Sequence, residues 1–189
     1  MISFIVEKSS IRRGMEDVRK IQLSSIMFWA MLLFYVGLLI QLLFMRGDAD
    51  FRSVNFIPFA SINDYIQVDD GIQTRLVDVN VWGNILIFIP AGIYFMLLRK
   101  TRSTLGVFLT IIVMSVAVEI IQYTFAIGAT DIDDVILNSF GGLLGIILFY
   151  LIMLFVKSTE KAKKIVAITS TAIGIPLFIL VIILFAFNR

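Results

Sequence analysis

Long apolar stretches alternate along this chain with shorter stretches that hold nearly all of its charged residues. Five of the apolar stretches are long, and they cover residues 24–45, 81–98, 105–127, 135–156 and 165–187. Each has roughly the 17–25 residues that an α-helix needs to cross about 30 Å of hydrocarbon. Because hydrocarbon offers the backbone no hydrogen bonds, a spanning stretch of this kind has to be helical. The pattern therefore predicts an all-α membrane protein, a polytopic bundle of five transmembrane helices.

The sign of the charge alternates from one connection to the next. Lys and Arg gather in three regions, residues 8–20, 99–102 and 157–164. The connection 46–80 holds more Asp than Arg, and the connection 128–134 holds aspartates and no basic residue. Since Lys and Arg in short loops stay on the cytoplasmic side, every crossing predicts the same topology. The N-terminus is expected in the cytoplasm and the C-terminus outside it.

Composition agrees with a membrane protein and narrows the chemistry. The chain is 59% hydrophobic and 16% charged, and its mean hydropathy is +0.97, which is too apolar for a soluble surface. It contains no cysteine and no histidine. Disulfides, thiolate metal sites, a cysteine nucleophile and imidazole chemistry are therefore excluded. Any reaction has to use carboxylates, amides, hydroxyls and the backbone, and nothing in the pattern indicates nucleic-acid binding.

Glu119 is the only Asp, Glu, Lys or Arg residue inside the five apolar stretches. A charge near the bilayer centre costs about 2.5–3.5 kcal/mol on insertion scales, and such residues usually face the protein interior or a water-filled cavity. Gln122 follows three residues later and lies on the same helix face. Glu119 is therefore the first candidate for a functional residue, and Gln122 is expected to act beside it.

Further polar residues lie at a similar depth on two other predicted helices. Asp131, Asp134 and Asn138 share one face at the start of the fourth helix, whereas Asp133 points elsewhere. Asn84 lies about one turn inside the outer end of the second helix. Their depth predicts a polar cluster in the outer half of the bundle.

Plain structural roles could account for several of these residues. Carboxylates that precede a helix can cap its N-terminus, and amides can form interhelical hydrogen bonds. Gly141 and Gly145 are four residues apart, the spacing that lets two helices approach closely, so we interpret them as packing residues. Glu119 is the residue that a structural role explains least well.

Four segments, in this order, resemble the VanZ-like family of bacterial membrane proteins. They are Asn55–Phe59, Asn84–Gly92, Glu119–Gln122 and Asp131–Asn138, the last followed by Gly141-Gly142. The resemblance covers roughly residues 25–156 and implies a multi-pass protein of the cell (cytoplasmic) membrane with a role at the envelope. The founding member of the family is associated with low-level resistance to teicoplanin, a lipid-tailed glycopeptide antibiotic.

This chain departs from the family pattern at one place. An arginine often stands a few residues before the aspartate run, but here the stretch reads Gly128-Ala129-Thr130. If that arginine binds an anionic group in relatives, this chain has to use another group or lacks the contact. Arg52 or Arg75 from the outer loop could substitute.

The resemblance also divides the chain into three parts. Residues 1–23 are expected to be a cytoplasmic N-terminal segment. Residues 24–156 are expected to form a VanZ-like four-helix membrane domain with an outer loop at 46–80. Residues 157–189 would add a cytoplasmic basic loop and a fifth transmembrane helix.

The first functional hypothesis is a non-enzymatic envelope protein. It would bind or shield a lipid-linked envelope molecule or a lipoglycopeptide at the outer leaflet, with membrane lipids as its surroundings. The lipid tail would lie between helices, and the head group would meet the polar side chains. The expected binding residues are Glu119, Gln122, Asn84, Asn138, Asp134 and Asp131.

Two alternatives remain open. In the first, the protein is an intramembrane enzyme that modifies a lipid-linked head group, with Glu119 as the catalytic base. Asp131, Asp134 and Asn138 would then hold Mg²⁺, which prefers oxygen ligands. In the second, Glu119 carries protons in a transporter, although a single intramembrane carboxylate provides few sites for proton transfer across the membrane. No cofactor is indicated outside the enzyme alternative.

Overall fold

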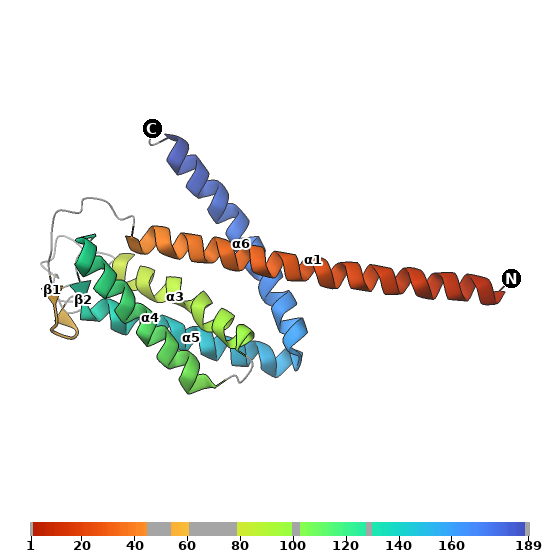
Figure 1. Ribbon diagram of the computed structural model, residues 1–189, viewed down its shortest axis with the longest axis horizontal. Coiled ribbons are helices and arrows are strands. Elements are labelled where there is room, and N and C mark those ends of the chain that lie inside the picture. The colour runs from red at the N-terminus through yellow and green to blue at the C-terminus, as the bar shows by residue number, and fades with distance from the viewer. Residues whose placement is uncertain (1, 45–53, 61–78, 100–102, 128–129, 188–189) are drawn as a thin grey trace, which may run out of the picture. The chain divides into compact units, whose positions relative to one another are not determined.

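The chain forms long helices and one very short parallel strand pair. The computed structural model describes residues 2–44, 54–60, 79–99, 103–127 and 130–187 (Figure 1). The helices are α1 (Ile2–Phe44), α3 (Val79–Leu98), α4 (Thr104–Phe125), α5 (Ile132–Val156) and α6 (Thr159–Phe187). The strands are β1 (Val54–Asn55) and β2 (Thr130–Asp131), which pair Val54 with Thr130 and Asn55 with Asp131.

The hydropathy pattern predicted these helices correctly. Within the described residues, five helical segments are long and apolar enough to cross a membrane. They are Gln22–Phe44, Val81–Leu98, Thr104–Phe125, Ile132–Val156 and Thr159–Ile183. The prediction of a helical protein with five candidate spans is confirmed. The strand pair is an addition that hydropathy cannot indicate, because two residues carry no periodicity.

The chain divides into two compact units, each of which we describe by itself. The first unit comprises Met1–Tyr35 and Val156–Arg189, and the second comprises Val36–Phe155. In the first unit α1 packs on α6, where the rings of Phe34 and Phe178 meet edge to face with 5.6 Å between centroids. The second unit holds the end of α1, both strands, and α3, α4 and α5.

Helix α5 packs tightly against α3 in the second unit. A Cβ added at Gly141 would overlap the carbonyl oxygen of Ile85, and one at Gly145 would overlap that of Ile89. Only glycine allows the two backbones to approach so closely. The interpretation of Gly141 and Gly145 as packing residues is therefore confirmed.

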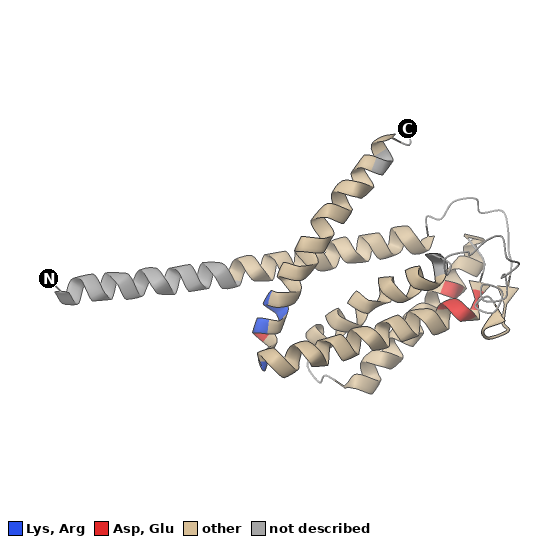
Figure 2. Cartoon of the chain, turned by 180° about the vertical axis from the view of Figure 1, so that it is seen from behind, with Lys and Arg blue, Asp and Glu red and all other residues tan. Residues whose placement is uncertain are grey.

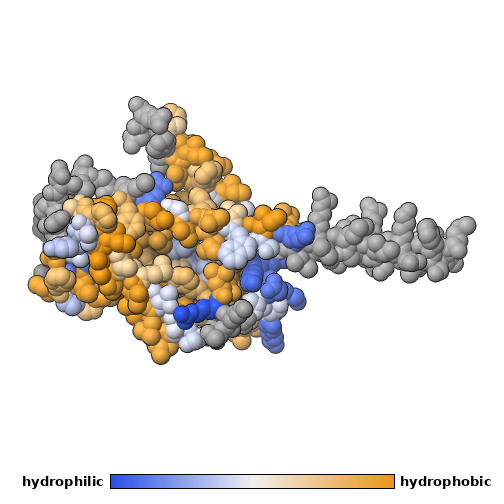
Figure 3. All heavy atoms as spheres, in the orientation of Figure 1, coloured by the Kyte–Doolittle hydropathy of each residue, from blue (hydrophilic) through white to orange (hydrophobic). Residues whose placement is uncertain are grey.

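The same unit has a buried core and an apolar surface. Phe88 and Met96 of α3, Ile111 of α4 and Phe149 of α5 are fully buried. Large apolar side chains remain exposed along the helices, for example Val113 at 66%. Apolar side chains also cover much of the helical surface visible in Figure 3. An exposed apolar surface of this extent is typical of helices that face lipid.

Candidate functional site

Acidic residues gather at one end of the second unit. Glu119 comes from the C-terminal half of α4, Asp131 from β2, and Asp133 and Asp134 from the first turn of α5. Figure 2 shows them in red at the end of the helices that lies beside the strand pair. The chain brings them together because β2 and the start of α5 follow α4 within a few residues in the sequence.

A left-handed residue turns the chain at the end of α4. Ala126 has a φ of 54°, and its N–H donates to the carbonyl oxygens of Gln122 and Tyr123. The N–H of Ile127 donates to the Gln122 oxygen at 3.0 Å. These bonds satisfy carbonyl groups that the helix end would leave unpaired. The next described element is β2, whose backbone forms a hydrogen bond with the Glu119 side chain.

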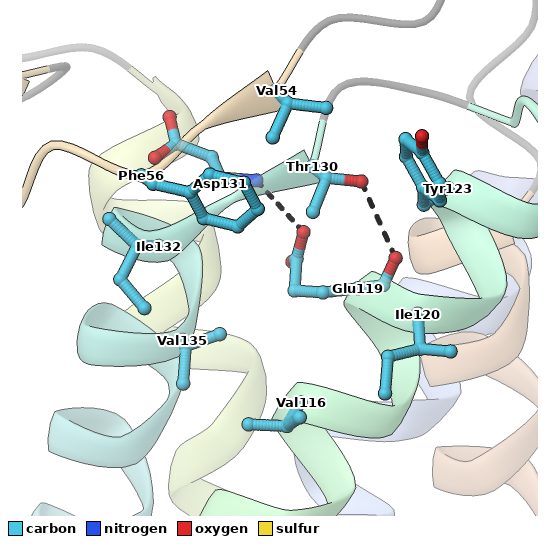
Figure 4. Close-up of a pocket in the computed structure, with 10 residues that line it drawn as sticks. All are labelled: Val54, Phe56, Val116, Glu119, Ile120, Tyr123, Thr130, Asp131, Ile132 and Val135. Carbon is cyan, nitrogen blue, oxygen red and sulfur yellow. Dashed lines mark hydrogen bonds between the residues drawn. The ribbon is translucent and has the colours of Figure 1, made fainter.

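The Glu119 side chain is almost completely buried and fixed by β2. It is 6% exposed, and its Oε2 accepts the backbone N–H of Asp131 at 2.9 Å (Figure 4). The hydroxyl of Thr130 donates to the Glu119 carbonyl oxygen at 3.4 Å. A carboxylate that accepts a backbone N–H is well oriented. The Glu119 side chain therefore has a defined direction, toward β2.

Asp131 caps helix α5. Its Oδ1 accepts the N–H of Asp133 at 2.9 Å and the side-chain amide of Asn55 at 3.0 Å. An acidic side chain at this position pairs a free N–H and favours the positive end of the helix dipole. The capping role considered from the sequence is thus realised by Asp131, which at the same time ties α5 to β1.

Residues 54–60, which we call the strap, lie over the start of α5. Within the strap, Asn55 Oδ1 accepts the N–H of Ile57 at 3.0 Å. The N–H of Phe59 donates to Asp133 Oδ1 at 2.5 Å, and Asp133 is 1% exposed. Sequence reasoning missed this role of Asp133, because it considered helix capping and the helix face but not a backbone donor 74 residues away in the chain. Phe59 has a φ of 65°, a conformation that is unfavourable for a bulky residue.

Two hydrogen-bonded pairs of polar side chains join α5 to α3 and α4. The Asn84 amide of α3 donates to Asp134 Oδ1 at 2.5 Å. The Asn138 amide donates to the hydroxyl of Ser115 on α4 at 2.9 Å, and both residues are fully buried. The Asn138 oxygen has no hydrogen-bond partner in the described part of the chain. These side chains form the interhelical bonds that polar residues commonly make in membranes.

Gln122 joins α4 to the end of α1. Its amide donates to the backbone oxygen of Leu43 at 2.8 Å. Its own side-chain oxygen is buried without a partner among the described residues. Gln122 therefore turns toward α1 rather than toward the strand pair.

A cavity of about 300 Å³ lies beside Glu119 (Figure 4). Its lining comes from the strap, α4, β2 and the start of α5, and consists of Val54, Phe56, Val116, Glu119, Ile120, Tyr123, Thr130, Asp131, Ile132 and Val135. Phe56 and Ile120 are exposed at 75% and 60%. The cavity therefore opens at the surface of the unit, and its wall is mostly apolar.

The structure separates the predicted binding residues into two groups. Glu119 and Asp131 line the cavity. The remaining four are absent from its described lining and bond neighbouring segments instead; they are Gln122, Asn84, Asn138 and Asp134. Val54 and Phe56 of the strap were not singled out from the sequence as site residues, although the Asn55–Phe59 segment that contributed to the family resemblance contains Phe56.

The carboxylates do not converge as a metal site would require. Among the described residues, no group of three or more Asp, Glu, His or Cys side chains could hold a metal ion. Asp131 bonds Asn55 and the α5 backbone, and Asp134 bonds Asn84. The geometry gives no support to a Mg²⁺ site made from Asp131, Asp134 and Asn138.

Comparison with known proteins identifies the family. Residues 28–156 match the VanZ/LLP1 family. This chain belongs to the VanZ/LLP1 family. It is also 39% identical over 98 residues to Protein VanZ of Enterococcus faecium, across 52% of this chain and 53% of that relative. The chain thus matches about half the length of that relative, and no solved structure matches it.

The matched VanZ/LLP1 segment contains the whole described site. The cavity lining runs from Val54 to Val135, inside residues 28–156. The segment ends with α5, so α6 lies outside it. The arginines considered as substitutes for the missing basic residue, Arg52 and Arg75, lie outside the described residues.

Proposed function

We propose that this VanZ-like envelope protein lies in the cytoplasmic membrane with its N-terminus inside and its C-terminus outside. The charge pattern of its connections supports this orientation. Within the second unit, the acidic residues lie at the strand-pair end, and Arg99 follows the other end of α3. The cavity beside Glu119 then opens toward the outer leaflet.

In this orientation the cavity binds or shields a lipid-linked envelope molecule or a lipoglycopeptide. The observation that carries the proposal is a buried carboxylate in the wall of an apolar cavity that opens at a lipid-facing surface. Glu119 lies about 9 Å from the end of α4, at 1.5 Å per residue. A carboxylate at membrane depth is expensive to maintain and usually marks a functional site.

The cavity wall and its polar end take different parts of the ligand. Val116, Ile120 and Val135 contact the lipid tail, and Glu119 with Asp131 meets the head group. This function requires no covalent reaction, because a ligand held in the cavity can no longer reach its target. Residues 24–156 carry this function, and residues 157–189 add a cytoplasmic basic loop and a further membrane helix.

The test is antibiotic susceptibility in a sensitive Gram-positive host. Cells express the wild type, the Glu119→Gln variant, or the Glu160→Gln control, whose carboxylate is exposed on α6. Membrane levels are matched by blotting. The wild type and the control should protect selectively against teicoplanin, and Glu119→Gln should weaken protection by roughly tenfold or less, as expected for one lost polar contact.

Two outcomes would count against this function. If the wild type gives no protection, the chain does not confer teicoplanin resistance. If Glu119→Gln abolishes protection at a normal membrane level, a catalytic role for Glu119 explains the result better than binding does.

A further inference from the structure

The cavity beside Glu119 distinguishes between classes of polar head group. Its wall is aliphatic and aromatic, as a hydrocarbon tail requires. Its ionisable groups are Glu119, Asp131 and the phenol of Tyr123, and none of the described lining residues is basic. The polar end of this cavity therefore offers carboxylate and hydroxyl oxygens as acceptors and, among the described residues, no cationic group.

One oxygen of Glu119 is available to a ligand. Oε2 accepts the N–H of Asp131 at 2.9 Å, whereas Oε1 receives no hydrogen bond from any residue that the structure describes. The side chain is 6% exposed and lines the cavity. A carboxylate oxygen in apolar surroundings gains from a donor, because leaving it unpaired is costly. A ligand that donates hydrogen bonds supplies that partner.

The described ionisable residues near the cavity are acidic, like Glu119 and Asp131. Asp133 and Asp134 follow Asp131 in the first turn of α5. Of the basic residues in the second unit, the structure describes Arg99, whose guanidinium donates to Thr110 at 3.2 Å. Thr110 precedes Glu119 by nine residues on α4, which is about 13 Å along the helix. The charges of the described residues thus attract a cation to the cavity and repel a phosphate.

We propose that the cavity selects amphiphiles that carry a primary ammonium group next to an aliphatic chain, in preference to amphiphiles that carry a phosphate. The ammonium group has three N–H donors. One reaches Glu119 Oε1, and the Thr130 hydroxyl oxygen in the same cavity lining is a second acceptor. A volume of about 300 Å³ accommodates this group and the adjoining part of the chain. This inference rests on the proposed function and specifies its ligand chemistry.

Photo-cross-linking of the purified full chain in nanodiscs of zwitterionic lipid tests the inference. Three probes share one alkyl chain with a mid-chain diazirine and end in an amine, a phosphate or a hydroxyl. Labelling of Val116 and Val135 is divided by labelling of Val113, which is exposed on α4 and outside the described lining. This ratio corrects for the different partition of the probes into the bilayer.

The amine probe should give a ratio about tenfold above that of the phosphate probe in the wild type. Glu119→Gln should lower the amine ratio to that of the hydroxyl probe, and Glu160→Gln should leave it unchanged. A phosphate ratio equal to or above the amine ratio would overturn the inference and leave the proposed function standing. If no probe labels the cavity above Val113, the proposed binding function itself is overturned.

Discussion

At the scale of single residues, backbone N–H groups from distant segments hold the buried carboxylates of the acidic end. Glu119 accepts from Asp131, and Asp133 accepts from Phe59, 74 residues away in the chain. A hydrogen bond to an ionised group contributes about 1.5–3 kcal/mol, and a buried N–H without an acceptor is costly. The carboxylates therefore hold the strap and β2 in place as walls of the cavity.

The strap should loosen when Asp133 loses its acceptor. Asp133→Ala leaves the N–H of Phe59 without its partner, so the strap separates from α5 and the exchange of the Phe59 amide accelerates by roughly tenfold or more. Asp133→Asn keeps a carbonyl acceptor and should show a smaller effect. Hydrogen exchange with mass spectrometry on the peptide that contains Phe59 measures both variants. An unchanged exchange rate in Asp133→Ala would show that Asp133 does not hold the strap.

At the scale of helices and strands, the glycine face of α5 sets the spacing from α3. Gly141 and Gly145 lie directly against backbone oxygens of α3, so no side chain fits between the helices. The same close contact brings Asn84 within reach of Asp134. Helix spacing and the interhelical polar pairs therefore depend on the same residues.

Gly141→Ala should destabilise the second unit. The added methyl group would overlap the carbonyl oxygen of Ile85, and overpacking of this kind costs about 1–3 kcal/mol. Gly37→Ala on α1 is the matched control, because a Cβ there meets nothing within 4 Å and alanine favours a helix. Unfolding in detergent micelles should show a lower stability for Gly141→Ala only. Equal stability of the two variants would contradict the close packing of α3 on α5.

The helices were predictable from sequence, but their ends were less so. Helix α6 begins at Thr159, earlier than the apolar stretch at residue 165, because Glu160 and Lys163 form a polar first turn with a 3.5 Å ion pair. Helix α5 begins at Ile132, where Asp131 caps it. Hydropathy marks the part of a helix that faces lipid, and polar turns beyond it leave no such signal.

The site was only partly predictable for a related reason. Glu119 stood out because a charge inside an apolar stretch is costly. The hydrogen bonds of the strap did not, because those to Asp131 and Asp133 join residues 76 and 74 positions apart, and two of the strap's bonds use backbone N–H groups. Backbone groups are the same in every sequence, so pairing of this kind has no pattern that a single chain can reveal.

At the scale of the whole molecule, the charge of the connections supports one orientation in the membrane. The proposed site requires the acidic end to lie outside, where lipid-linked envelope molecules expose their head groups. The chain has no cysteine, so a single introduced thiol reports on its own position without background.

Cysteine labelling should therefore divide the connections into two classes. A membrane-impermeant thiol reagent added to intact cells should label Thr74→Cys, in the 46–80 connection, and spare Thr101→Cys, in the 99–103 connection. Both variants should react after the cells are opened, which controls for the reactivity of each site. Labelling of Thr101→Cys in intact cells would reverse the proposed topology and place the cavity on the cytoplasmic side.

We propose that this VanZ/LLP1 protein acts through the cavity beside Glu119. The most direct measurement compares teicoplanin protection by Val116→Phe, which fills the cavity, with protection by Val113→Phe, which adds the same bulk to the lipid-facing surface of α4. At equal membrane levels, Val116→Phe should fall to the susceptibility of the host, and Val113→Phe should protect like the wild type. Full protection by Val116→Phe would show that the protein does not act through this cavity.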